Sequence, residues 1–279
     1  NIFIITPLDT QYPERLRSIA DFPIVLYIKG KLPEIDREPV ISIVGPRKIS
    51  QFGKKASFSL AKRLCAAGMI IASGGALGAD TCAHKGALAA KGKTVAVLGC
   101  GICSDYLPEN RQLRQEITKN GCLISEYPPY ASATKYAFPI RNRIVSAISL
   151  GTVVIEAGTK SGALITARLA NEQGRDVFVI PGNPTLPEYK GSNALLRDGA
   201  YVLLDASDIF NQYITEFYDK IDIKKAFCKD DSEKDSQKNL KKLQLGLSKE
   251  AEIVYNNLVN SKFTADDLLT LGLSDDELI

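Results

Sequence analysis

Two things are scarce in this sequence of 279 residues: long apolar runs and histidine. No apolar run approaches the roughly 20 residues that a membrane-spanning helix needs, and no signal-peptide pattern opens the sequence. We therefore expect a cytoplasmic protein that makes no contact with a membrane. Because the first residue is Asn1 rather than Met, we also expect the natural chain to begin further upstream.

Histidine occurs once, at His84, which leaves few ligands for a metal centre. The segment Cys100-Gly101-Ile102-Cys103 matches a C-x-x-C pattern, but no second cysteine pair and no histidine cluster accompanies it. Several of the six cysteines lie in apolar segments, where a free thiol behaves as a small apolar group. We therefore expect reduced cysteines, no metal and no cofactor.

Net charge is also small, at +3 for the whole sequence, but it is unevenly placed. Residues 1–218 carry 25 Lys/Arg against 19 Asp/Glu, whereas residues 243–279 carry 2 against 7. The body is mildly basic and the tail is acidic. Charge alone therefore does not establish nucleic-acid binding.

Short apolar runs alternate with helical patterns between residues 40 and 205. The expected strands are Val40–Val44, Met69–Ala72, Thr94–Leu98, Leu123–Ser125, Thr152–Ile155, Val177–Ile180 and Tyr201–Leu204. The expected helices lie at about 51–67, 79–91, 109–120, 139–150, 162–174 and 192–198. Continuous apolar strands of this kind suit a parallel sheet that is buried on both faces. The predicted fold class is therefore α/β, with an extended Rossmann-like, doubly wound and mostly parallel sheet.

Composition divides the chain into four regions. Residues 1–39 contain five prolines, and we expect them to lay a short helix and the strand Val25–Lys29 on the main domain. Residues 40–218 form the Rossmann-like domain. Residues 219–246 are charged and poor in apolar residues, as linkers are. Residues 247–279 contain helix-start signals and predict a small α-helical domain, a truncated winged helix.

Two loops at the predicted carboxyl edge of the sheet carry anion-binding features. Arg47 follows the first core strand and precedes Ser50, which can cap the next helix, so its guanidinium overhangs a helix N-terminus. The loop from Ser73 to Asp80 contains Gly74 and Gly75, which permit close approach of the backbone to a phosphate. This loop has neither the dinucleotide fingerprint nor the P-loop ending, so packing explains its glycines about equally well.

The segment Phe138-Pro139-Ile140-Arg141-Asn142-Arg143 is the most informative one. Arg141 and Arg143 offer guanidinium groups that suit phosphates, and an exposed Phe138 suits an unstacked base. Lys135 lies three residues before Phe138, so a turn can direct both side chains into one groove. The pattern favours single-stranded nucleic acid over a small metabolite.

The acidic residues near this edge have two interpretations. Glu126, Glu156 and Asp80 end or follow strands and could serve acid–base chemistry, but we favour a role in offsetting the nearby arginines. Arg141 and Arg143 could accordingly brace Glu126 and Glu156 rather than contact a ligand. His84 has no nucleophile or metal partner in the sequence, so we favour a polar contact at a helix start over a catalytic base.

These motifs together resemble the DprA/Smf family of DNA-processing proteins of bacterial transformation. The matching segments run in family order across about residues 10–205. They are Val44–Arg47, Ser73–Asp80 with His84, Ser125–Pro128, Phe138–Arg143, Val154–Ala157, Ser161–Thr166 and Pro181–Gly182.

The resemblance implies a protein that is not an enzyme, binds single-stranded DNA, and as a homodimer loads the RecA recombinase onto incoming strands. It implies that Arg47 and Lys135 hold phosphates and that Phe138 meets a base. The backbone around Gly74, Gly75 and Ser161–Gly162 would line the groove, next to Arg141, Asn142 and Arg143. Pro46 departs from the family, which often has a small polar residue there, and it removes one N–H donor.

Two other functions are open from the sequence. A nucleotide phosphoribohydrolase could use Glu156 and Arg141, although the segment from Gly151 to Glu156 lacks the glycine pair of such enzymes. A dinucleotide oxidoreductase would need the G-x-G-x-x-G fingerprint, which is missing. For the dimer surface, the resemblance points to residues 183–218, where apolar residues cluster that could equally pack in the core. These are Leu186, Leu195, Leu196, Ile209 and Phe210.

Overall fold

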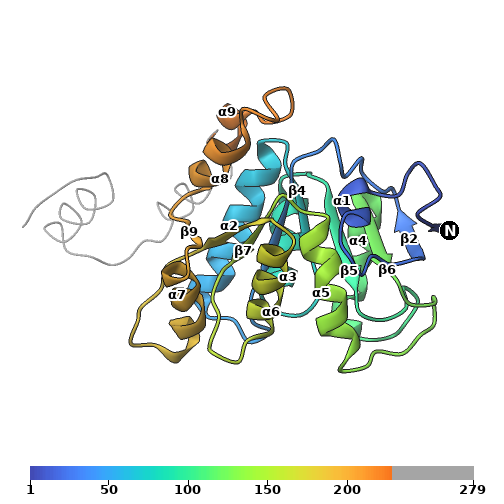
Figure 1. Ribbon diagram of the computed structural model, residues 1–279, viewed down its shortest axis with the longest axis horizontal. Helices are drawn as coiled ribbons and strands as arrows, with labels where there is room; N and C mark the ends of the chain where they lie inside the picture. The colour runs from blue at the N-terminus through green and yellow to red at the C-terminus, as the bar shows by residue number, and fades with distance from the viewer. Residues whose placement is uncertain (228–279) are drawn as a thin grey trace, which may run out of the picture. The chain divides into compact units, whose positions relative to one another are not determined.

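The computed structural model describes residues 1–227, and these form a mixed sheet with strand order β1-β2-β6-β5-β4-β3-β7-β8-β9 (Figure 1). Every neighbouring pair from β6 to β9 is parallel, whereas β1 and β2 are antiparallel to their neighbours. The strands are β1 (Ile2–Ile5), β2 (Leu26–Gly30), β3 (Val40–Val44), β4 (Ile70–Ser73), β5 (Thr94–Leu98), β6 (Gly121–Ser125), β7 (Gly151–Val154), β8 (Asp176–Val179) and β9 (Tyr201–Val202). This confirms the predicted Rossmann-like α/β sheet.

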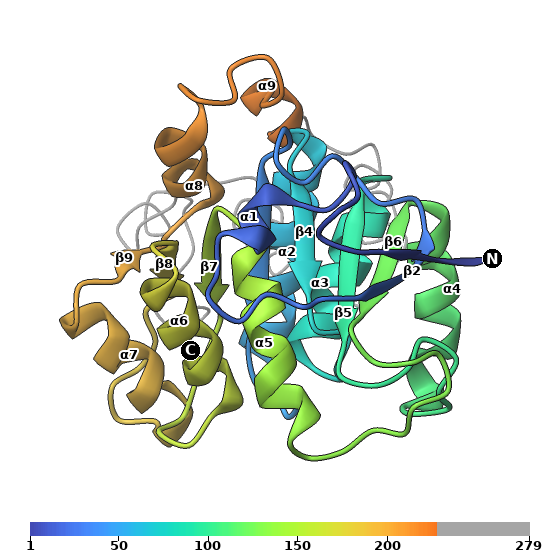
Figure 2. The same cartoon turned by 45° about the vertical axis from the view of Figure 1, so that its right-hand side comes forward.

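Helices cover both faces of the sheet. One core cluster joins α2 (Gln51–Ala66) and α3 (Ala79–Ala89) to α8 (Ala206–Tyr213) and α9 (Ile223–Ala226), and α4 (Arg111–Lys119) continues this layer. The opposite face holds α1 (Glu14–Arg17), α5 (Ala137–Ala147), α6 (Gly162–Glu172) and α7 (Lys190–Arg197). Figure 2 shows α5 and α6 in front of the strands and α2 and α3 behind them. Short 3-10 turns precede α4 and α7, at Pro108–Asn110 and Pro187–Tyr189.

The central strands are buried along their whole length, as their continuous apolar sequences predict. Every residue of β3, β4, β5, β6 and β7 is buried. Ser42 Oγ and Thr152 Oγ1, the polar exceptions facing each other on β3 and β7, lie 2.7 Å apart and satisfy each other. Strand order reverses between β3 and β7, and in such sheets the crevice beyond the carboxyl ends at this point is the usual ligand site.

The N-terminal extension differs from the prediction. The predicted strand at Val25–Lys29 is β2, but it pairs antiparallel to β6, and the sequence analysis did not predict β1 at all. Strand β1 is a short apolar run at the edge of the sheet, and an edge strand contacts one neighbour only, so Phe3 and Ile4 remain exposed. Leu16 of α1 is fully buried in the same core cluster as α5, which fixes this extension against the main sheet.

The sequence prediction also missed two helices, α8 and the short α9. Asp205 and Asp208 form a capping box at the start of α8, and Ile209 and Phe210 are completely buried. These two residues, suggested for a dimer surface, therefore belong to the core. Leu195 and Leu196 also pack partly against the core, whereas Leu186 is 40% exposed.

The predicted linker is wrong over residues 219–227, because α9 lies in this segment and Ile221 and Ala226 are buried in a core cluster. The rest of the linker and the predicted C-terminal helices lie outside the described residues. Within residues 1–227, no helix is both long and apolar enough to cross a membrane. Cys100 and Cys103 of the C-x-x-C segment are free, one buried and the other exposed. No group of three or more potential metal-ligating side chains occurs in this described part of the chain.

Candidate nucleic-acid interface

The loop between β3 and α2 presents Arg47 at the carboxyl edge of the sheet. Ser50 caps α2 by accepting a hydrogen bond from the Gly53 N–H at 2.9 Å. Glu156, beyond the end of β7, accepts hydrogen bonds from both the N–H and the hydroxyl of Ser50, each at 2.7 Å. Because Glu156 anchors the loop in this way, the helix start is fixed and Arg47 is left exposed above it.

Arg47 meets Phe138 from the start of α5. The guanidinium carbon lies 4.9 Å from the centroid of the Phe138 ring, and on the same ring the Tyr106 centroid lies 5.1 Å away. A cation over an aromatic face is attracted by the ring quadrupole, so the two side chains hold each other in place. The result is a positive group and a half-buried aromatic ring side by side at the switch point of the sheet.

The glycine loop after β4 packs tightly between these elements. Gly78 has φ +83°, and a Cβ there would collide with the carbonyl oxygens of Pro46 and Arg47. A Cβ on Gly74 would collide with the guanidinium of Arg141. Internal packing thus already requires these two glycines. The loop is further held by Asn110, whose side-chain amide donates to the carbonyl of Gly75 at 3.2 Å.

Arg141 lies beneath the glycine loop, at the inner wall of the groove. It is 5% exposed, and Nη1 donates a hydrogen bond to the Val97 carbonyl at 2.5 Å. Burial lowers the pKa of Arg141, and Asp80 opposes that shift; burial likewise raises the pKa of Asp80, against the charge of Arg141. The two charges therefore compensate each other in the interior. Glu156, one of the two acidic residues that these arginines could have braced, is instead bound to Ser50.

Arg143 is the second arginine of this helix that turns inward. It is 8% exposed, and its guanidinium binds both carboxylate oxygens of Glu126, at 2.9 and 2.7 Å. Its Nε lies 3.1 Å from a carboxylate oxygen of Asp21, in the N-terminal extension. The interpretation that Arg143 braces Glu126 is confirmed. Both arginines are almost fully buried and each binds an internal group, Arg141 the Val97 carbonyl and Arg143 the Glu126 carboxylate, so we do not retain them as phosphate contacts.

His84 is completely buried in the middle of α3 and makes a polar contact, as favoured over catalysis, but with the start of a strand rather than of a helix. Its Nδ1 lies 2.7 Å from the hydroxyl of Thr94 on β5. Burial, and secondarily the charge of Arg141, lowers the pKa of His84 to about 3. A ring that stays neutral and out of reach of solvent is a poor candidate for an acid–base catalyst.

The groove contains a cavity of about 110 Å³ that is lined by most of the predicted site residues. Six of the ten predicted residues line it, namely Arg47, Gly74, Phe138, Arg141, Asn142 and Gly162. Gly75 lines a small adjoining cavity. Ser161 caps α6 next to the groove by accepting a hydrogen bond from the Ala163 N–H. Lys135 is exposed in the loop before α5, with its ammonium 5.0 Å from the Tyr136 ring. Arg143 lines neither cavity.

Two residues of this site carried little or no signal in the sequence. From the sequence alone, Tyr106 could add stacking surface or pack in the core, and only the fold brings it against Phe138. Asn110 looks like an ordinary residue before a helix, yet its amide crosses to the glycine loop 34 and 35 positions away. Such long-range hydrogen bonds have no periodic signature in a sequence.

Known proteins with similar sequences settle the family. The family model for DNA recombination-mediator protein A matches residues 3–214. The chain belongs to this family. The DNA processing protein DprA of Bacillus subtilis is 41% identical over 202 residues, covering 72% of this chain and 68% of that protein.

Two solved structures agree with this. The X-ray structure of DprA from Streptococcus pneumoniae has a TM-score of 0.72 and 36% identity, covering 76% of this chain and 74% of that chain. DprA from Helicobacter pylori, described for its single-stranded DNA binding mode, has a TM-score of 0.69 and 30% identity. That match covers 77% of this chain and 97% of the other. The resemblance found in the sequence is thereby confirmed.

Proposed function

We propose that this chain binds single-stranded DNA as a recombination mediator, which protects incoming DNA during natural transformation and loads RecA onto it without catalysing a reaction. The observation that carries the proposal is the placement of Arg47 over the Phe138 ring at the β3–β7 switch point. The H. pylori relative, whose structure was described for its single-stranded DNA binding mode, supports it. The cytoplasmic location stays a prediction.

The groove suits single strands because it combines two kinds of contact. An aromatic ring at a groove can stack on an unpaired base of any sequence, which is worth about 1–3 kcal/mol per base. Arg47 and Lys135 are exposed cations on two loops that flank Phe138, and they can take successive phosphates. Few groups are placed to distinguish one base from another, so we expect affinity with little sequence preference.

The test is a titration of fluorescent oligo-dT followed by anisotropy. The double variant Arg47→Glu/Lys135→Glu should abolish binding and leave the circular dichroism spectrum and melting temperature unchanged. The matched control is Lys91→Glu/Lys119→Glu, which alters the charge equally at two exposed positions at the opposite edge of the sheet, before β5 and β6. Equal affinities for the groove variant and the wild type would refute the assignment.

RecA loading and the homodimer are further parts of the proposal. Strand β9 ends the sheet among the described residues, and Tyr201, Val202 and Leu204 are 48%, 52% and 79% exposed, which supports an apolar interface between copies. Light scattering of wild type and Leu204→Asp should distinguish a dimer from a monomer. RecA loading should appear as faster strand exchange on oligonucleotides coated with a single-strand-binding protein.

Nothing in the geometry favours the phosphoribohydrolase. Of the two residues it would use, Glu156 is 1% exposed and bound to Ser50, and Arg141 is directed at the Val97 carbonyl. A general acid or base must reach its substrate within hydrogen-bond distance. We therefore expect no release of free base from nucleoside monophosphates.

A further inference from the structure

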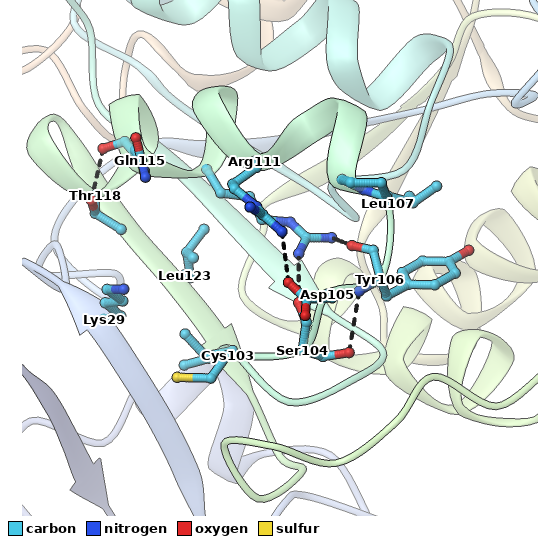
Figure 3. Close-up of a pocket in the computed structure, with 13 residues that line it drawn as sticks. Lys29, Cys103, Ser104, Asp105, Tyr106, Leu107, Arg111, Gln115, Thr118 and Leu123 are labelled. Atoms are coloured by element: carbon cyan, nitrogen blue, oxygen red, sulfur yellow. Dashed lines mark hydrogen bonds and ion pairs between the residues drawn. The ribbon is translucent and has the colours of Figure 1, made fainter.

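A second cavity of about 170 Å³ lies beyond Tyr106, between α4, the loop before it and the β2–β6 strand pair (Figure 3). Its floor is apolar, with Leu123 of β6 and Ile102 both buried. Lys29 of β2 is the register partner of Leu123 and also lines it. Gln115 and Thr118 of α4 complete the opposite wall. None of these side chains belongs to the groove described above.

The second cavity lies close to the groove, with a small cavity of about 10 Å³ between them. This small cavity shares Tyr106, Leu107 and Arg114 with the second cavity, and it shares Gly74, Phe138 and Arg141 with the groove. Tyr106 therefore has the Phe138 ring at 5.1 Å while it also lines the second cavity. A strand whose base stacks at Phe138 would have its next nucleotides directed past Tyr106.

The loop that forms the cavity rim is held in a strained conformation. Leu107 has φ +55°, in the left-handed region that a bulky side chain rarely adopts. Arg114 maintains it by donating hydrogen bonds to the carbonyls of Tyr106, at 2.6 Å, and Ser104, at 3.4 Å. Such strain persists where the surroundings over-determine the backbone, and it is concentrated at ligand sites.

The chemistry of the lining fits a nucleotide. The apolar floor suits the face of a base, and the Gln115 amide can both donate to and accept from a base edge. Lys29, Arg111 and Arg114 contribute three positive charges against one carboxylate, Asp105, which pairs with Arg111 at 2.7 Å. Lys29 forms no ion pair among residues 1–227, so its ammonium is available for a phosphate.

We propose that this cavity is a second nucleotide subsite, which takes an unstacked base and its phosphate from the same DNA strand beyond Phe138. The inference rests on the proposed function, because it extends that strand. It assigns base contact to the Leu123 floor and phosphate contact to Lys29. The path of bound DNA would then bend around Tyr106.

Cys103 lines the cavity and provides a direct probe (Figure 3). It is the exposed thiol among the described cysteines, since Cys65, Cys100 and Cys122 are buried and Cys82 is half-buried. In a full-length Cys82→Ser/Cys228→Ser background, the rate of alkylation by N-ethylmaleimide is measured with and without saturating 20-residue oligo-dT. Occupation of the subsite should slow the reaction several-fold.

A matched pair of charge variants supplies the second readout. Lys29→Glu should weaken oligo-dT binding by about 3- to 10-fold, as expected for reversing one charge at a phosphate contact. Lys31→Glu, two residues along and exposed but outside the cavity, should change affinity less than about 2-fold for the same reason. Together with protection of Cys103, this difference would support the subsite.

The outcomes separate the two proposals. If anisotropy shows saturable binding while the alkylation rate of Cys103 is unchanged, the second subsite is wrong and the groove assignment stands. Equal weakening by Lys29→Glu and Lys31→Glu would also overturn the subsite. If oligo-dT does not bind at all, the proposed function fails and the subsite fails with it.

Discussion

Four cations near one edge of the sheet divide into two kinds, and their difference is one of depth. Arg47 and Lys135, the rim cations, are exposed on loops beside Phe138. Arg141 and Arg143, the buried arginines, are 5% and 8% exposed and are bound to internal partners. An arginine beside a ligand groove is therefore no evidence of ligand contact until its depth is known.

Arg141 and Arg143 are buried because helix α5 runs from the groove into the interior of the protein. The helix begins at Ala137 by the groove, so Phe138 stands at the rim. Successive residues go deeper by about 1.5 Å each along the axis, so one turn later the side chains reach the interior. The buried arginines fill that interior with charge, which requires the carboxylates of Asp80 and Glu126. We therefore expect substitution of the buried arginines to lower the stability of the fold, and substitution of the rim cations to weaken DNA binding.

The largest expected effect is that of Arg141→Met. Removing the guanidinium leaves the Val97 carbonyl without its donor, and leaves the Asp80 carboxyl, which is 7% exposed, without the compensating charge of Arg141. Leaving a buried charge uncompensated costs about 3–5 kcal/mol of the free energy of unfolding. Urea denaturation followed by circular dichroism measures this loss.

The control for this variant is Arg141→Met/Asp80→Asn. Because it removes the carboxylate together with its cation, it should recover part of the lost stability. If Arg141→Met is as stable as the wild type, the charge of Arg141 does not stabilise the core. Burial would then not distinguish Arg141 from the rim cations.

Arg143→Met should have the next largest effect. The pair with Glu126 is bidentate and mostly buried, with side-chain exposures of 10% and 16%. Some solvent reaches it, so we expect a loss of about 2–3 kcal/mol, below the value for a fully buried pair.

Arg63→Ala is the matched control, since Arg63 pairs with Asp205 at 3.2 Å and both side chains are 44% exposed. An exposed pair of that kind is worth about 0–1 kcal/mol. Equal losses for both variants would contradict the role of depth.

The pH dependence of stability should be smaller and should be controlled by His84, the single histidine. Its pKa is lowered from 6.5 to about 3 by burial and by Arg141. Between these values the unfolded chain binds a proton and the folded chain does not, so acidification favours unfolding. From pH 7 to pH 5.5 this should remove about 1 kcal/mol.

Urea midpoints at the two pH values measure the effect, and His84→Gln provides the comparison. The glutamine side chain does not titrate, so the difference between pH 7 and pH 5.5 should shrink. A wild-type midpoint that does not change between these pH values would indicate that the ring is not buried in neutral form.

The sequence predicted what depends on local pattern. Strand β3 at Val40–Val44 and strand β5 at Thr94–Leu98 match their predicted bounds, because continuous apolar runs are typical of strands buried on both faces. Helix α2 ends one residue from its prediction. Strand β1 was missed although its four residues are all apolar, because so short a run does not by itself distinguish a strand from other apolar segments.

The site was predicted by residue type but not by depth. Phe138 and Arg47 do meet, yet the sequence could not tell that Arg141 and Arg143 point inward, because a guanidinium suits both a phosphate and a buried carboxylate. Depth depends on which face of α5 packs on the sheet. It also depends on Asp21 and Glu126, which only the fold brings to Arg143.

The smallest expected effect is on the salt dependence of DNA affinity, which distinguishes a cation that contacts a phosphate from one that does not. Each phosphate that a protein cation neutralises on a single strand adds about 0.7 to the slope of log affinity against log salt. Arg47→Gln should therefore lower the magnitude of that slope by about 0.7, since a neutral side chain releases no counterion. Arg63→Gln, in the last turn of α2 and so at the far end of that helix from the groove, should leave the slope unchanged.

Anisotropy titrations at four or more salt concentrations give both slopes. If Arg47→Gln weakens binding at one salt concentration but keeps the wild-type slope, Arg47 acts by holding the Phe138 ring and not by contacting a phosphate. Arg47 would then have a structural role, as the buried arginines have, although its side chain is exposed.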